Sequence, residues 1–248
     1  MKDLDPLPSF KVCGVPIALV GRAEATEKIV EAARGGFYLP AHLCNSYTLS
    51  LVDSDPRLRE ALLGGFNIAD GTPVAWIGRR HGLTAPVRGA DLVADVCSRN
   101  AGELRHFLYG GAPGVAAAMA ANLSARTGAV FVGVESPPFG EVSTQDLEEL
   151  AARVVDTGAD VLWVGLGTPK QDYVVADMGK LVRCPVVPVG AAFDFFAGTV
   201  AEAPKWMHGS GLEWIHRLIS EPRRLWKRYL IGNPRFLLAA ARHSWRHR

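Results

Sequence analysis

The chain has 248 residues, of which 48% are hydrophobic and 21% charged. This apolar content is too high for a disordered chain and allows one sizeable core. No apolar run approaches the roughly 20 residues of a membrane-spanning helix, and we expect neither a signal peptide nor a spanning segment. The four cysteines form no Cys-x-x-Cys pair. Their scatter argues against a metal or disulfide role and fits a reducing cytoplasm.

The net charge of +2 hides an asymmetry between the two ends of the chain. Residues 217–248 carry nine Lys and Arg and one acid, Glu221, which gives this end a charge of +8. The other 216 residues carry 18 basic and 24 acidic side chains, which gives them a charge of −6. A basic end on an acidic body predicts an anionic partner at that end.

Short apolar runs alternate with helical stretches along the body of the chain. This alternation predicts a layered α/β fold, with a mostly parallel sheet flanked by helices. Helices are expected at 23–34, from Asp55-Pro56 to Gly64-Gly65, from about Pro113, at 144–157, and after Thr168-Pro169. Strands are expected at 66–69, 107–109, 129–134, 161–164 and 186–189.

The composition changes near Pro204, where Trp, Arg and Leu become frequent. We therefore expect a body over 1–203 and a helical appendage over 204–248. Trp and Tyr beside Lys and Arg are typical of a segment that docks on an anionic membrane surface. Nucleic-acid binding is less favoured, because the body is acidic and carries no nucleic-acid motif. A plain alternative is a pair of helices that packs on the body.

Ligands of a parallel sheet bind beyond the carboxyl ends of its strands, and three loops of this chain are expected there. The first follows the strand at 107–109 and contains Gly110 and Gly111. Glycines allow the backbone to approach a phosphate, and the following helix offers free N–H groups. A tight strand-to-helix turn explains the same two glycines.

The second loop runs from Gly165 to Gln171 and again joins an expected strand to an expected helix. Gln171 is placed to contact a base or a ribose, and Lys170 to contact a phosphate. Thr168 and Gln171 also have the spacing of a capping box, which would give both side chains a structural role. The sequence leaves both interpretations open.

The third loop contains Asp70, which ends an expected strand and precedes Gly71. A carboxylate in this place can act as general base on an acceptor hydroxyl. An Asp-Gly turn or a helix N-cap is the alternative. Paired aspartates such as Asp53 and Asp55 can hold a divalent cation. Asp55-Pro56 fits a helix start better, so no metal site is expected.

The motifs of this chain, taken in order, resemble those of the WecG/TagA/CpsF glycosyltransferase family. They are Asn45 followed by D-P-R-L-R-E-A-L, then I-A-D-G-T-P-V, V-R-G-A-D-L, Y-G-G-A-P-G, V-G-L-G-T-P-K-Q, V-G-A-A-F-D-F-F-A-G, A-P-K-W and L-E-W-I-H-R-L-I-S-E-P-R-R-L-W-K-R-Y. The resemblance runs from about residue 10 to 240. One departure is Leu43, where some members have Thr two residues before the Asn.

The resemblance implies that the body over 1–203 is a Rossmann-like catalytic domain of the GT-E type that binds a nucleotide sugar. It also implies a peripheral protein on the inner face of the plasma membrane. It implies inverting transfer, with no metal or other cofactor, from a UDP-sugar to an undecaprenyl-diphosphate-linked saccharide. Teichoic acid, capsule and exopolysaccharide are products of such enzymes, and self-association stays open. Carried over by motif, Asp70 is the general base, and Arg217 and Arg224 complete the site at the diphosphate or acceptor. The implied donor or cleft residues are Asn45, Arg88, Gly110, Gly111, Gly167, Thr168 and Gln171.

Two other functions stay open at this point. One is a non-catalytic scaffold that binds a nucleotide sugar at the membrane. The other is a nucleotide-dependent oxidoreductase, although the glycines at 165 and 167 lack the third glycine of a dinucleotide-binding motif.

Overall fold

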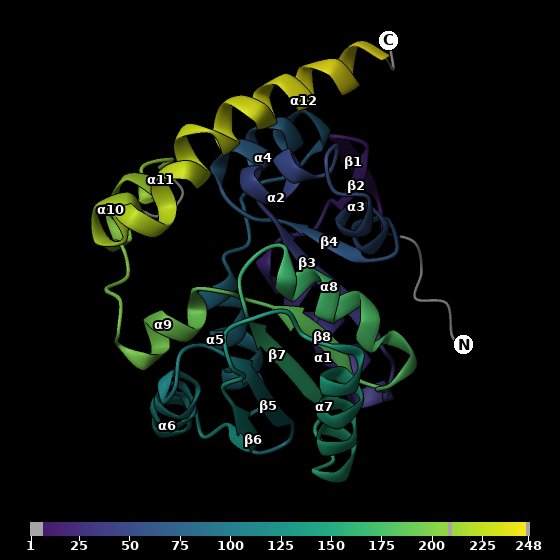
Figure 1. The fold of residues 1–248 in the computed structure, drawn as a ribbon, viewed down its shortest axis with the longest axis vertical. Helices are drawn as coiled ribbons and strands as arrows, with labels where there is room; N and C mark the ends of the chain where they lie inside the picture. Colours follow the sequence, from purple (N-terminus) through teal and green to yellow (C-terminus); the bar gives the residue numbers. More distant parts are fainter. Residues whose placement is uncertain (1–6, 208–209, 247–248) are drawn as a thin grey trace.

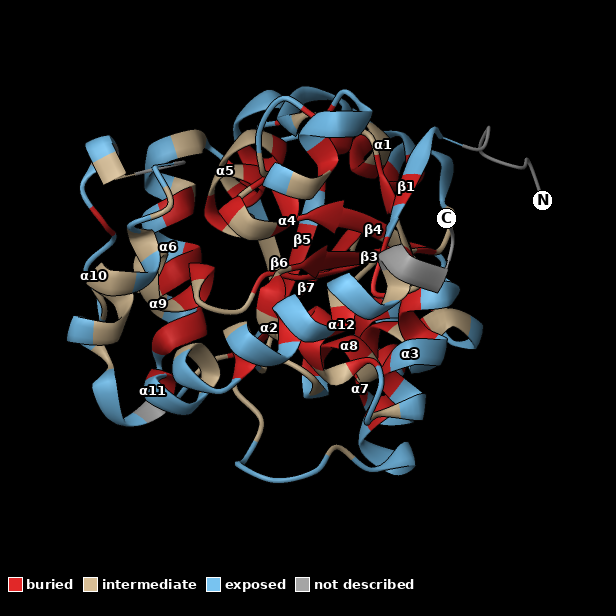
Figure 2. Ribbon diagram, turned by 90° about the horizontal axis from the view of Figure 1, so that it is seen from above, coloured by how far each residue is buried: buried red, intermediate tan, exposed pale blue. Residues whose placement is uncertain are grey.

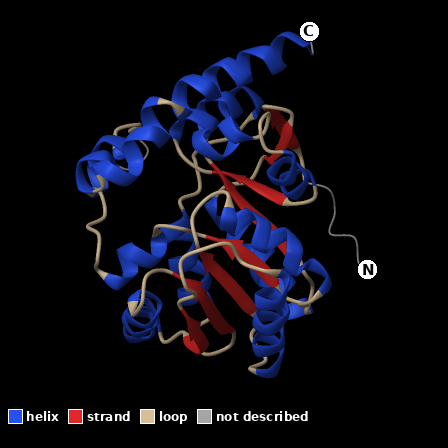
Figure 3. Cartoon of the chain, in the orientation of Figure 1, coloured by secondary structure: helices blue, strands red, loops and turns tan. Residues whose placement is uncertain are grey.

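The structure, a computed structural model, describes residues 7–207 and 210–246, without the side chains of residues 205, 224 and 244–246. Its centre is an eight-stranded sheet in the order β1-β2-β4-β3-β8-β7-β5-β6 (Figures 1 and 3). Only the β1–β2 pair is antiparallel, and every other pair is parallel. The predicted α/β class with a mostly parallel sheet is therefore confirmed. In chain order the strands are Ser9–Val12, Val15–Ala18, Leu39–Cys44, Phe66–Ala69, Arg105–Gly110, Val130–Glu135, Val161–Gly165 and Pro185–Pro188.

Helices cover both faces of this sheet, as expected for parallel strands joined by crossover connections. The helices of the body, α1 to α9, are Arg22–Gly35, Ser46–Leu51, Pro56–Leu63, Thr72–Gly78, Gly89–Arg99, Val115–Thr127, Thr144–Asp156, Lys170–Asp177 and Ala192–Ala197. The C-terminal helices α10, α11 and α12 are Glu213–Ser220, Pro222–Leu230 and Gly232–Arg246.

The strands direct alternate side chains into two helical layers. On β7, Val161 and Trp163 face the core shared with α1, α5, α6 and α9. Leu162 and Val164 face the core shared with α7 and α8. This period of two buries both faces of the strand, and Figure 2 shows the inner strands buried throughout. The sheet is thus a rigid platform whose carboxyl ends hold the loops described below.

The expected strands and helices of the body all form, with ends shifted by a few residues. The main omission is β3, which lies at the centre of the sheet between β4 and β8. Its sequence, L-P-A-H-L-C, has no β-branched or aromatic residue, so strand propensity gives no signal there. The β1–β2 hairpin was also not predicted.

The last helix, α12, packs on the body rather than standing apart from it. Phe236 and Ala239 belong to the buried cluster that contains residues of β1, β2 and α2. Ser46 Oγ donates a hydrogen bond to Asn233 Oδ1 at 2.9 Å. Figure 1 shows α12 lying across α2 and α4. The predicted division at residue 204 stays a prediction, but part of the appendage shares the core of the body.

The packing of α12 predicts a contrast between two neighbouring residues. Phe236 is 2% exposed and Leu237 is 66% exposed. Phe236→Ala removes a buried ring and is expected to lower the free energy of unfolding by about 3–5 kcal/mol. Leu237→Ala is the matched control, with an expected change within about 0.5 kcal/mol. Urea unfolding of both variants measures this, and equal losses would show that α12 does not dock as described.

Candidate active site

Asp70 and Asn45 lie side by side at the carboxyl ends of β4 and β3. The parallel ladder pairs Cys44 with Ala69, and the Asp70 amide donates to the Cys44 carbonyl at 3.0 Å. Asn45 is the N-cap of α2, and its Oδ1 accepts from the amides of Tyr47 and Thr48, each at 3.1 Å. Because the oxygen is used in this way, the amide nitrogen faces Asp70 and donates to Oδ2 at 3.2 Å.

The half-buried carboxyl group of Asp70 has a pKa above its ordinary value. Burial is the largest cause, because it disfavours the charged form. The hydrogen bond from Asn45 and the charges of Arg228 and Arg217 lower the pKa of Asp70, and Glu213 raises it. The net result is a carboxylate that binds a proton more tightly than an exposed aspartate does. That property suits a group that must accept a proton.

The two arginines that act on Asp70 come from the C-terminal helices. Arg217 of α10 lies with its guanidinium 5.8 Å from the ring of Phe195. Arg228 of α11 lies 4.9 Å from the ring of Tyr47. Burial and the charge of Arg217 lower the pKa of Arg228, and Arg217 Nε is buried without a hydrogen-bond partner among the described residues. Two guanidiniums whose charges act on one carboxylate favour an additional anion.

A chain of side-chain contacts connects this pair of strands to the glycine loop after β7. Gln171 Oε1 accepts from the Gly167 amide at 3.0 Å, and Gln171 Nε2 donates to Thr168 Oγ1 at 3.5 Å. Thr168 Oγ1 lies 3.5 Å from Thr48 Oγ1, which in turn donates to Asn45 Oδ1 at 3.3 Å. Because Asn45 also contacts Asp70, the structure joins Asp70 to the second predicted loop. The residues of that loop in the chain of contacts are Gly167, Thr168 and Gln171.

Gln171 and Thr168 stabilise their loop without forming the capping box. Helix α8 begins at Lys170, and its N-cap position is Pro169. The Gln171 side chain, 6% exposed, instead holds the Gly167 amide inside the loop. Gly167 has a φ of 77°, and an added Cβ would meet no heavy atom within 4 Å, so this turn faces open space. Lys170 Nζ donates to the Gly140 carbonyl at 2.6 Å.

Gly110 and Gly111 lie beside the same loop through backbone contacts. Gly110 pairs with Gly165 across β5 and β7, and a Cβ on Gly110 would lie 2.5 Å from the Gly165 carbonyl carbon. The Gly111 amide donates to the Gly165 carbonyl at 3.0 Å. Close packing between β5 and β7 therefore accounts for the glycine at position 110. The described contacts connect the two glycines to Gly165 rather than to Asp70.

Arg88 is held in a cluster of carboxylates. Its Nη2 lies 2.5 Å from Glu202 Oε1, its Nε lies 3.0 Å from Glu213 Oε2, and its Nη1 lies 3.5 Å from Asp91 Oδ2. Arg88 thereby connects α5 to the segment before α10 and to α10 itself. The other predicted arginine, Arg224, belongs to α11, but its side chain lies outside the described residues.

Sequence reasoning missed three residues of this site: Arg228, Tyr47 and Thr48. Arg228 follows Arg224 by four residues on α11, so the two occupy one face of the helix. That spacing was the available signal for Arg228. Tyr47 and Thr48 lie in the first turn of α2, a helix that was not predicted. Leu43, noted above as a departure, is 7% exposed and belongs to the body core.

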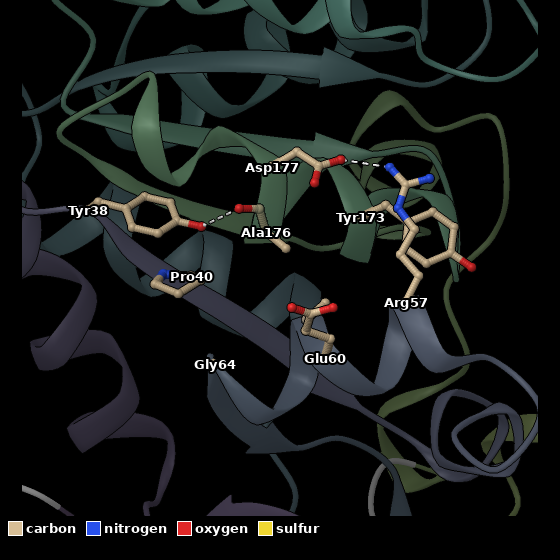
Figure 4. A pocket seen from close by; sticks show the side chains of 9 residues that line it. Tyr38, Pro40, Arg57, Glu60, Gly64, Tyr173, Ala176 and Asp177 are labelled. Atoms are coloured by element: carbon tan, nitrogen blue, oxygen red, sulfur yellow. Dashed lines mark hydrogen bonds and ion pairs between the residues drawn. The ribbon is translucent and has the colours of Figure 1, made fainter.

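The hollow drawn in Figure 4 is a separate feature. It has a volume of about 320 Å³ and lies between α3 and α8, where Tyr38 and Pro40 mark the beginning of β3. Arg57 is already bonded to Asp177 at 2.7 Å and lies 4.4 Å from the Tyr173 ring. None of the predicted site residues lines this hollow. Among the described residues, no three His, Cys, Asp or Glu side chains gather in a way that would hold a metal ion.

The comparison with protein families decides the class of this site. A model of the glycosyl transferase WecG/TagA/CpsF family matches residues 10–248. The chain belongs to this family. The protein is therefore a glycosyltransferase, which implies a nucleotide-sugar donor and an acceptor substrate. The match extends from β1 to the C-terminal end, so it includes the helices that carry Arg217 and Arg228.

Proposed function

We propose that this protein is an inverting enzyme that transfers a sugar from a UDP-sugar to an undecaprenyl-diphosphate-linked saccharide. The product belongs to cell-surface polysaccharide synthesis, such as teichoic acid, capsule or exopolysaccharide. The observation that carries the proposal is the half-buried carboxylate of Asp70, held by Asn45 and influenced by the charges of Arg217 and Arg228. This arrangement combines a proton acceptor with cationic groups suited to a diphosphate.

In the proposed reaction, Asp70 accepts the proton of the acceptor hydroxyl. The hydroxyl oxygen attacks the anomeric carbon from the face opposite the diphosphate, and the bond from that carbon to UDP breaks with its electron pair on the phosphate oxygen. Positive charge develops on the sugar ring, as in other glycosyl transfers. Asn45 keeps the carboxylate in one orientation through its hydrogen bond of 3.2 Å. General-base assistance of this kind is typically worth about 100- to 10,000-fold in rate.

We propose that the departing UDP is stabilised by protein groups without a metal. Arg217 and Arg228 supply two guanidiniums that balance developing negative charge. The N-terminus of α8, next to Gly167, adds the positive end of a helix dipole, which favours the approach of phosphate oxygens. The open space around Gly167 leaves room for such an approach.

The proposed acceptor is lipid-linked, and the C-terminal helices offer a surface suited to a membrane. No helix in the described part of the chain has both the length and the apolar character needed to cross a bilayer. Large apolar side chains are nevertheless exposed on these helices, beside exposed cations. They are Ile219, Trp226, Leu230, Leu237 and Leu238, with Lys227, Arg235 and Arg242. We propose that this surface docks on the anionic inner face of the plasma membrane.

The proposed base gives the central prediction. Asp70→Asn is expected to lower kcat by about 100- to 10,000-fold, because the amide accepts no proton. Folding stability at pH 7 should stay equal or rise. The pKa of Asp70 is raised in the folded state, so ionisation above its ordinary pKa disfavours folding, and the neutral amide removes that cost.

UDP release with several UDP-sugars and a short-chain lipid-diphosphate disaccharide measures turnover of this variant, and thermal unfolding measures its stability. Near-normal turnover in Asp70→Asn would remove Asp70 from the role of base. A wild-type protein that binds UDP-sugar yet releases no UDP with any acceptor would support the scaffold function instead. Binding of NAD(P) in place of UDP, measured by calorimetry, would support an oxidoreductase.

The hydrogen bond from Asn45 predicts the direction of a pH effect. Asn45→Ser keeps an oxygen that caps α2 but removes the amide donor to Asp70. The pKa of Asp70 should rise, since that bond lowers it, and the acid limb of kcat/KM should move to higher pH because the base works deprotonated. Asn122→Ser is the control, since Asn122 bonds the Phe196 carbonyl on the surface. An unmoved limb in Asn45→Ser would contradict the proposed contact.

The membrane proposal is tested by removing exposed positive charges from the C-terminal helices without changing buried side chains. Replacing Lys227, Arg235 and Arg242 by Gln should weaken binding to anionic vesicles by at least tenfold, since each cation near the surface contributes about 1 kcal/mol. Co-sedimentation with phosphatidylglycerol-containing vesicles measures this loss. The control replaces the exposed Arg99, Lys180 and Arg183, which precede strands at the opposite end of the sheet. Equal losses in the two triple variants would place the contact elsewhere.

A further inference from the structure

A histidine and an aspartate form a pair inside the protein beneath the site. His42 and Asp172 are 0% and 1% exposed, and His42 Nδ1 lies 2.9 Å from Asp172 Oδ1. The other polar atom of each side chain, His42 Nε2 and Asp172 Oδ2, is buried and has no hydrogen-bond partner in the part of the chain that the structure describes. Such a pair contributes little to stability, because apolar residues of similar volume generally pack as well or better. Its presence therefore calls for a role other than stability.

The two residues belong to the two elements that carry the halves of the site. His42 lies on β3, three residues before Asn45, which contacts Asp70. Asp172 lies in the first turn of α8, directly after Gln171, which holds the Gly167 loop. The half with the base and the half with the glycine loop are thus joined below the site by a short, buried side-chain contact between β3 and α8.

The contact between the same two halves at the site itself is longer. Thr48 Oγ1 and Thr168 Oγ1 lie 3.5 Å apart, which is at the limit of a hydrogen bond. The His42 ring is also fixed from the side, because a Cβ on Gly65 would lie only 2.4 Å from its Cδ2 atom. Contact with Gly65 on one side and the bond to Asp172 at Nδ1 favour one orientation of the ring, and this orientation ties Asp172 to β3.

We propose that His42 and Asp172 are a positioning pair that keeps the Gly167 loop in register with Asp70 and Asn45. This inference rests on the proposed function, since it assigns the pair to the geometry of donor and base. In the proposed reaction the pair touches neither substrate. It acts by fixing α8, and through Gln171 the loop, at the distance from Asp70 that transfer requires. A displacement of about 1 Å far from the reacting atoms can lower a rate by about 100-fold.

The test separates positioning from stability with an apolar replacement of both residues. The double variant His42→Leu, Asp172→Leu leaves no unpaired buried polar atom, so its unfolding midpoint should stay near that of the wild type or rise. Its kcat should fall by about 100-fold, and its KM for the UDP-sugar should rise. Wild-type kcat and KM in a folded double variant would overturn the proposal.

His106 provides the matched control. It is also fully buried and accepts a hydrogen bond from Trp163 Nε1 at 3.2 Å, and its Nε2 atom has no partner among residues 7–207 and 210–246. It joins β5 to β7 inside the sheet and contacts neither half of the site through the bonds described. His106→Leu should change the unfolding midpoint without changing kcat or KM. A loss of kcat in this control as large as in the double variant would assign the effect to core polarity in general and overturn the proposal.

If the double variant does not fold, two single variants of Asp172 test the positioning role instead. Asp172→Asn keeps the length needed to reach His42, whereas Asp172→Ser is too short to reach it. At equal folded fraction, kcat should stay near the wild-type value in the first variant and fall in the second. Equal kcat in the two variants would overturn the proposal.

The turnover of the wild-type protein distinguishes failure of the proposed function from failure of the positioning role. If it releases no UDP with any substrate pair, the positioning role is still tested by hydrogen exchange. The exchange rates of the Gly167 and Thr48 amides report whether the hydrogen bonds of the two halves of the site are kept. Faster exchange in the double variant than in His106→Leu would support the positioning role for whatever ligand the site takes. Unchanged exchange would overturn it.

Discussion

The site depends on one side chain that makes two kinds of hydrogen bond. Asn45 uses its carbonyl oxygen to cap α2, and this leaves its amide nitrogen to hold Asp70. Asparagine is suited to this place because it carries an acceptor and a donor on one planar group. Aspartate would cap the helix equally well but would set two carboxylates against each other. The beginning of a helix and the orientation of the proposed base therefore have the same cause.

The C-terminal helices belong to both the core and the site. Helix α12 contributes Phe236 to the core of the body, and α10 and α11 contribute the arginines that act on Asp70. A positive end on an acidic chain thus has two separate explanations. Half-buried guanidiniums lower the pKa of Asp70, and exposed ones lie beside apolar side chains on the outer surface. Total charge does not distinguish these groups, because burial decides what each one does.

The sequence supported the fold class and the local parts of the site, and it failed where distant segments meet. Asp70 was predicted because it ends an expected strand and matches a family motif, whereas Asn45 was predicted from the family motif alone. The central strand β3 was missed because its residues lack strand propensity, although its neighbours on both sides bury it. His42 and Asp172 are 130 residues apart and lie in unremarkable local sequence, so only the fold brings them together. Arg88 carried a motif signal, yet its three carboxylate partners come from three separate segments.

The ion-pair cluster of Arg88 has a consequence for how the two surfaces of α10 communicate. Glu213 begins α10 and bonds Arg88, and one turn later Arg217 acts on Asp70. Helix α10 is held at one end by Arg88, before α5, and has exposed side chains on another face. It can therefore contact the candidate site and an outer partner at the same time. Thermodynamic reciprocity then governs any coupling through α10: the factor by which an outer partner changes affinity at the inner site equals the factor by which an inner ligand changes affinity for that partner.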